Sequence, residues 1–228
     1  MRQRPFSIGV GAWILAAILL LAVPSRAQAS TISYANRTAW ETATPGFTNI
    51  TFDGAPTNSF ISYGFGPALF SGVSFNTFGS LFTIDPTLNP SRYDWGSGDI
   101  LSNQGVNLPM TVTLPTGVTS VGFDFMTLST DATGALVFGD TVQITLSTGE
   151  FFLLSSLQYP NRAFAGFIST TPITSLTIRA STYSHLFLDN FAFGQGAAAA
   201  PVPEPASLLL LASGLGAVAA RLRFTKRQ

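Results

Sequence analysis

The sequence predicts an all-β ectodomain, a two-sheet antiparallel sandwich of jelly-roll-like form with one short N-terminal helix. Three features of residues 30–193 predict it. Apolar and polar residues alternate in short runs. These runs are separated by Gly, Pro and Asn, and a helical periodicity of apolar residues is almost absent. Two such sheets bury their apolar faces most simply against each other.

The predicted helix covers Arg37–Ala43, ahead of the first strand. Asn36 is a favourable N-cap, Trp40 faces inward, and Pro45-Gly46 ends the helix.

The predicted strands follow at close spacing. Alternation is cleanest in the strand over residues 120–127, where Val121, Phe123 and Phe125 share one face. Thr148-Gly149 predicts a tight hairpin between two later strands. The strands are expected at Asn49–Asp53, Leu69–Asn76, Leu81–Ile84, Met110–Leu114, Ser120–Thr127, Ala135–Phe138, Thr141–Ser147, Glu150–Leu154, Phe164–Ile168, Ser175–Ala180 and His185–Phe193.

Charge is segregated along the chain although the net charge is zero. Residues 30–200 hold ten acidic residues against four arginines and no lysine, a net charge of −6. An acidic, lysine-free domain lacks the basic clusters that bind nucleic acid. The absence of cysteine excludes disulfides and thiolate chemistry, so a core rich in the 20 phenylalanines must hold the fold.

The N-terminus has the pattern of a secretory signal peptide over residues 1–29. Arg2 and Arg4 precede an apolar stretch, and Ala27-Gln28-Ala29 forms an A-x-A cleavage pattern. We expect a signal-peptide helix, export by the Sec translocon, and cleavage by signal peptidase before Ser30. The alternative is an uncleaved anchor.

The C-terminus combines a linker over residues 194–202, a Pro-Glu-Pro tripeptide, an apolar run and a basic tail. The run at 206–220 predicts a short transmembrane helix of about 22 Å, extended by snorkelling side chains. The tail at 221–228 predicts a membrane stop with a cytoplasmic basic cluster, formed by Arg221, Arg223, Lys226 and Arg227.

These C-terminal features together resemble the PEP-CTERM sorting signal of exopolysaccharide-producing Gram-negative bacteria, here over residues 203–228. The resemblance implies that exosortase recognises Pro203, Glu204 and Pro205 and processes the chain nearby. It also implies transient anchoring by the C-terminal helix, then a cell-surface or extracellular location. An unprocessed single-pass anchor is the alternative.

The ectodomain is weakly similar to the carbohydrate-binding-module-like jelly rolls that PEP-CTERM proteins often carry. The similar pieces are the early helix and residues 50–54, 71–75, 121–125 and 188–191. In such jelly rolls a structural Ca²⁺ often joins the first and last strands, and Asp53 and Asp189 match those positions. No other cofactor is expected. Asp189 shares a predicted strand face with Phe187, Phe191 and Phe193, so it needs a backbone N–H, an arginine or an ion as partner.

Catalytic residues are not predicted. His185 is the one histidine, there is no G-x-S-x-G motif in the ectodomain, and zinc needs more His or Cys ligands than exist. The loop from Tyr93 to Asp99 is the most suggestive segment. Tyr93 and Trp95 could stack on a sugar while Asp94 and Asp99 accept hydroxyls or bind Ca²⁺. A glycosidase pair of Asp94 and Asp99, or a plain surface turn, are the alternatives.

The sequence thus predicts a non-enzymatic, exported surface or matrix protein associated with exopolysaccharide and biofilm. A carbohydrate-binding module is the first alternative, and a glycoside hydrolase the second.

Overall fold

The computed structural model describes residues 30–103, 105–130, 133, 135–157, 160–180 and 184–197. The predicted signal peptide, most of the linker, the Pro203–Pro205 motif, the apolar run and the basic cluster therefore lie outside the described residues. No helix within the described part of the chain is long and apolar enough to cross a membrane.

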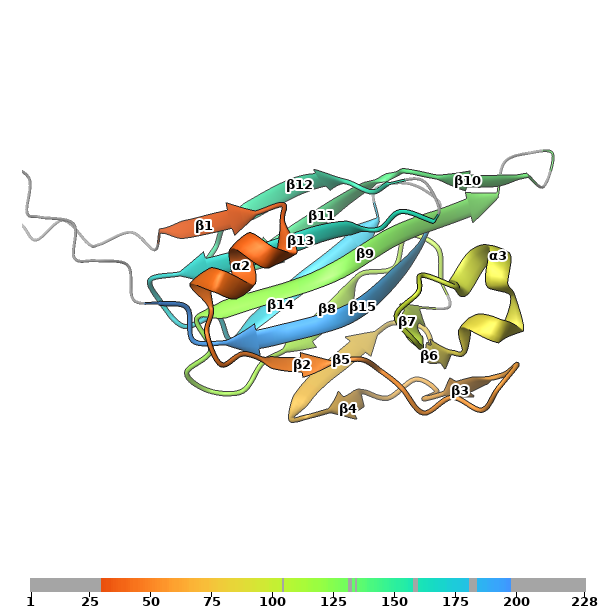
Figure 1. Cartoon of the computed structure of the whole chain (residues 1–228), viewed down its shortest axis with the longest axis horizontal. Coiled ribbons are helices and arrows are strands. Elements are labelled where there is room, and N and C mark those ends of the chain that lie inside the picture. Colours follow the sequence, from red (N-terminus) through yellow and green to blue (C-terminus); the bar gives the residue numbers. More distant parts are fainter. Residues whose placement is uncertain are drawn as a thin grey trace, which may run out of the picture.

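Two antiparallel sheets form a sandwich, which confirms the predicted fold class (Figure 1). The larger, sheet A, runs β1-β13-β9-β15-β7-β6-β3, with β10 added to β9 and β2 added to β15. Sheet B runs β12-β11-β14-β8-β5-β4.

The strands of sheet A are β1 (Thr31–Tyr34), β2 (Thr48–Ile50), β3 (Phe60–Ser62), β6 (Leu81–Ile84), β7 (Ile100–Asn103), β9 (Ser120–Thr130), β10 (Leu136–Phe138), β13 (Ala163–Ser169) and β15 (His185–Gly194). Those of sheet B are β4 (Ala68–Phe70), β5 (Val73–Thr77), β8 (Met110–Thr113), β11 (Thr141–Leu146), β12 (Phe151–Ser155) and β14 (Ser175–Ala180).

The predicted helix is α2 (Arg37–Ala43), and the Asn36 side chain accepts the backbone N–H of Ala39 at 2.9 Å, as its capping role requires. It does not precede the first strand, because β1 comes before it. Two further short helices, η1 (Pro86–Leu88) and α3 (Pro90–Tyr93), begin at prolines, which suit the first turn of a helix.

The predicted strand over residues 69–76 is instead a hairpin of β4 and β5. Ser71 and Gly72 turn the chain with φ of +48° and +82°, values that a continuous strand does not adopt. Three short strands, β1, β3 and β7, were not predicted. All four residues of β7 are buried, so it shows no alternation.

The main core lies between the sheets and contains seven phenylalanines, as the composition predicts. They are Phe52, Phe75, Phe123, Phe125, Phe167, Phe191 and Phe193. Phe191 is fully buried in this core, with its ring stacked on Phe123 at 5.7 Å and edge-on to Phe75 at 5.1 Å.

Two smaller clusters cover the outer face of sheet A, the face turned away from sheet B. At one end Trp40 of α2 packs on Ile168 and Ala192. At the other, Trp95 packs with Met126 and Phe187. Between them lies a strip of charged residues.

Candidate functional site

The charged strip begins with two aspartates on neighbouring strands. Asp124 of β9 and Asp189 of β15 are direct cross-strand partners, and both are buried. Their side chains lie on the outer face, because Phe123, Phe125 and Leu188 beside them fill the core between the sheets. Like charges directly opposite each other destabilise a sheet unless cations compensate them.

A β-bulge beside Asp189 corrects the sequence prediction for this strand. The register shifts between Asp189 and Ala192, and Asn190 has φ +47°. The extra residue sends Phe191 and Phe193 into the main core, while Phe187 packs with Trp95 on the outer face. Asp189 therefore shares a face with Phe187 but not with Phe191 and Phe193.

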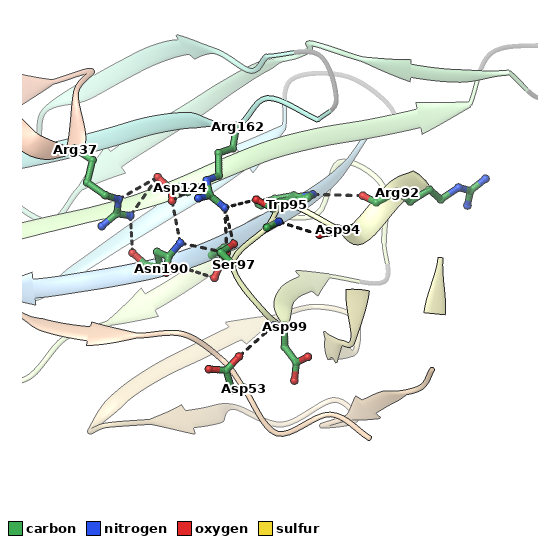
Figure 2. A network of polar contacts seen from close by, with 12 residues as sticks. Arg37, Asp53, Arg92, Asp94, Trp95, Ser97, Asp99, Asp124, Arg162 and Asn190 are labelled. Atoms are coloured by element: carbon green, nitrogen blue, oxygen red, sulfur yellow. Dashed lines mark hydrogen bonds and ion pairs between the residues drawn. The ribbon is translucent and has the colours of Figure 1, made fainter. Parts of the chain in front are cut away.

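Two arginines compensate the aspartates (Figure 2). Arg37 of α2 lies 3.2 Å from the Asp124 carboxylate and donates to the Asn190 carbonyl at 2.8 Å. Arg162 contacts Asp124 at 3.3 Å and Asp189 at 3.7 Å. The Asn190 amide also donates to Asp124, at 3.1 Å.

Ser97 links this strip to the loop that follows α3. Its hydroxyl donates to Asp189 and accepts from Arg162 at 2.5 Å, and Arg162 also donates to the Trp95 carbonyl at 2.8 Å. The network therefore joins α2, sheet A and the loop into one unit (Figure 2).

Burial raises the pKa of Asp189 to about 7. Hydrogen bonds from Ser97 and from the Asn190 backbone N–H, together with Arg162, act in the opposite direction, and Asp124 adds to the rise. Within the described residues, every buried side-chain nitrogen or oxygen has a hydrogen-bond partner. A serine, a backbone N–H and an arginine thus meet the requirement predicted for Asp189.

The predicted loop residues do not gather around one ligand site. Trp95 is only 6% exposed, its indole N–H donates to the Arg92 carbonyl at 3.4 Å, and Tyr93 and Trp95 both pack on Phe187. The Trp95 ring is therefore closed to a stacking sugar. Asp94 accepts the Gly96 backbone N–H at 3.0 Å, as in a turn.

Asp99 fastens the loop to the segment after β2. It accepts the backbone N–H groups of Gly54 at 2.8 Å and Ala55 at 2.6 Å. Its own N–H donates to Asp53 at 3.3 Å (Figure 2). Asp99 is 5% exposed and its carboxylate accepts backbone N–H groups, so a role as glycosidase acid or base has no geometric support.

Asp53 and Asp189, the predicted calcium pair, have different contact partners. Asp53 accepts from the Thr51 hydroxyl and from Asp99, whereas Asp189 contacts Ser97, Asn190 and Arg162. In the part of the chain that the structure describes, no three His, Asp or Glu side chains are arranged to hold a metal ion.

His185 lies at the start of β15, where its ring contacts the Asn103 carbonyl at 3.3 Å. Sequence reasoning missed Arg37, Asp124, Arg162, Asn190 and Ser97 as members of the network. The alternation in residues 121–126 already places Asp124 opposite the core face, and four arginines in an acidic domain are natural partners for such an acid.

Comparison with known proteins gives one sequence match. Residues 201–223 match the family model described as the PEP-CTERM protein-sorting motif. The chain thus carries a PEP-CTERM sorting motif, which confirms the resemblance seen in the sequence. The motif implies export, processing by exosortase, and a cell-surface or extracellular location. No curated protein matches the chain.

Solved structures give only distant likenesses. A mutant of CBM29-2, a family 29 carbohydrate binding module, is 13% identical over 69% of this chain and 100% of its own, with a TM-score of 0.32. The K2 cleaved adhesin domain of Lys-gingipain is 11% identical over 66% of this chain and 100% of its own, with a TM-score of 0.33. The Agl-KA catalytic domain is 13% identical over 68% of this chain and 31% of its own, with a TM-score of 0.35. Likenesses this distant carry no argument about ligand or activity.

Proposed function

We propose that the protein is a non-enzymatic, exosortase-sorted surface or matrix protein that associates with exopolysaccharide. The sorting motif at residues 201–223 is the observation that carries the proposal. In this route signal peptidase cleaves before Ser30, which becomes the first residue of the mature protein. The C-terminal helix then anchors the protein transiently in the inner membrane of a Gram-negative cell, until exosortase cleaves near the motif and detaches the protein from its anchor.

The positions of Ser30 and Ala197, the first and last described residues of the ectodomain, support this route. Ser30 accepts the Thr170 N–H at 3.1 Å, and Ala197 donates to the Ala43 carbonyl at 2.9 Å. β1 begins and β15 ends at the same end of the sandwich (Figure 1). Four Cα steps separate Ala197 from residue 201, so the motif begins at most about 15 Å from this end. We propose that the α2 end of the sandwich faces the membrane before processing.

The engagement of the acidic residues supports a non-enzymatic role. Asp124 and Asp189 are paired with arginines, and Asp99 holds backbone N–H groups. A general acid must reach a substrate oxygen directly or through one water, and these buried groups are committed to structural partners.

The test compares cells that produce the wild type with cells that produce Glu204→Ala. We expect wild-type protein in the exopolysaccharide extracted from the cells and the variant in the inner membrane. Equal partition of both proteins would reject sorting by the motif. Purified wild type should also leave chromogenic glycosides intact, whereas turnover that Asp94→Asn abolishes would establish the hydrolase alternative.

The carbohydrate-binding alternative is favoured by a different observation. Within the described part of the chain, α2 and α3 pack on sheet A, and the outer face of sheet B carries mainly uncharged polar side chains. In this alternative, a sugar chain would bind to this face rather than to the loop at residues 93–99.

A further inference from the structure

The outer face of sheet B is formed by every second residue of its strands. In β11, Val142, Ile144 and Leu146 are buried in the main core, and the residues between them point outward. The same alternation holds in β5, β8, β12 and β14. Among the described elements, helices α2 and α3 pack on sheet A instead (Figure 1).

The outward residues line up in rows across the strands. The central row crosses five strands in register and contains three adjacent threonines. It consists of Phe151, Thr145, Thr177, Thr111 and Asn76. With about 4.8 Å between strands, the row is about 19 Å long.

Shorter rows run on both sides of the central row. One joins Leu153, Gln143 and Arg179, and the other joins Ser175, Thr113, Ser74 and Leu69. Hydroxyl and amide groups therefore repeat in two directions. Phe151 and Leu153 are each 59% exposed at one edge, and Leu69 is 71% exposed at the other.

Charge sets this face apart from the rest of the ectodomain. Residues 30–200 carry a net charge of −6, yet Arg179 is the one charged residue among the outward positions of the described sheet B strands. The Arg179 guanidinium donates to the Asn107 side chain at 2.9 Å. An anionic polymer would be repelled by the acidic domain and would find one cation on the face.

We propose that the outer face of sheet B binds an extended, neutral polysaccharide laid along the central row. This inference rests on the proposed function and names its binding face and ligand class. Thr145, Thr177 and Thr111 exchange hydrogen bonds with sugar hydroxyls. The ring of Phe151 packs against the apolar face of a sugar at the sheet edge.

A second copy of the chain is a poorer occupant. Protein interfaces are depleted in charge at their centre but concentrate large apolar and aromatic side chains there. Here the centre consists of threonines, and the apolar residues lie at the edges.

The test uses native affinity electrophoresis of the purified, processed protein in gels that contain hydroxyethyl cellulose, with alginate gels as the anionic comparison. The test variant is the double substitution Thr111→Val with Thr177→Val. Valine keeps the shape and the β-branch, so only the hydroxyls are lost. Thr48→Val, an exposed strand position in sheet A, is the matched control. Thermal unfolding of each variant confirms its fold.

We expect hydroxyethyl cellulose to retard the wild type and the Thr48→Val control equally, including at high salt. Two lost hydroxyl bonds should weaken the apparent affinity of the double variant about tenfold. Absence of retardation, equal retardation of the double variant, retardation by alginate alone, or self-association that explains the shift would each overturn the inference. Correct processing of the same variants in cells would show that sorting stands independently of this result.

Discussion

Replacing Asp189 by Asn removes the buried group whose pKa differs most clearly from its value in the unfolded chain. The pKa rises from 3.8 to about 7 on folding, chiefly because of burial. Between these values the folded protein binds a proton that the unfolded chain has released. The proton therefore stabilises the fold at low pH, and this stabilisation is lost as the pH rises through 7.

The size of the effect follows from the shift. At about 1.4 kcal/mol for each pH unit, the wild type should lose roughly 3 kcal/mol of unfolding free energy between pH 4.5 and pH 7.5 through this group alone. The surrounding charges are Asp124 and Arg162, with Arg37 behind Asp124. The amide side chain of the Asp189→Asn variant would keep an acceptor for the Asn190 N–H and would not titrate.

The assay is urea unfolding of the wild type and of Asp189→Asn at four pH values from 4.5 to 7.5, with a calcium chelator present. We expect the wild-type free energy to fall with pH relative to the variant. Asp85→Asn is the matched control. The Asp85 carboxylate accepts a hydrogen bond from Thr87 that lowers its pKa, so it titrates below this range. Parallel curves for the wild type and Asp189→Asn would refute the reasoning.

Three further perturbations test the account. Arg162→Met removes a cation that contacts Asp124 and Asp189, and it should lower the free energy of unfolding in urea at pH 7.5 by about 3 kcal/mol. The control Arg179→Met, on sheet B, should lower it by under about 1 kcal/mol. Equal losses in the two variants would contradict the role of the network. Gly166→Ala puts a methyl group 2.6 Å from the Trp40 ring and should lower the stability measured by thermal unfolding by about 1–3 kcal/mol. The control Gly66→Ala places its methyl group in open space and should lower the stability far less. An unchanged melting temperature of Gly166→Ala would show that Trp40 packs elsewhere. The calcium pair predicted from the sequence requires CaCl₂ to raise the melting temperature of the wild type and not of Asp53→Asn, and no rise in the wild type would reject that pair.

Features set by neighbouring residues could be predicted from the sequence. Asn36 caps α2 as expected, and the Thr148-Gly149 turn joins β11 to β12 with Gly149 at φ +99°. The sorting motif was also recognisable, because its parts are contiguous in the chain. The core face of β9 could also be predicted, because strict alternation along the strand determines which side chains point into the core.

Features set by distant residues could not be predicted. The bulge at Asn190 depends on how β15 pairs with β9, and it alone decides which phenylalanines share a face with Asp189. Trp95 looks like an exposed loop aromatic until Phe187 and Met126 cover it. The threonine row of sheet B joins residues from separate segments of the chain, so no local pattern reveals it.

The central claim, sorting through the C-terminal motif, is tested most directly by the intact mass of the native protein from fractionated cells. Glu204→Ala is compared with the wild type, and Glu41→Ala serves as the matched control. We expect wild type and control to begin at Ser30, to lack the C-terminal segment and to lie outside the inner membrane, while Glu204→Ala keeps its C-terminus. If all three extend from Ser30 to Gln228 in the inner membrane, the motif is only an anchor and the account is wrong.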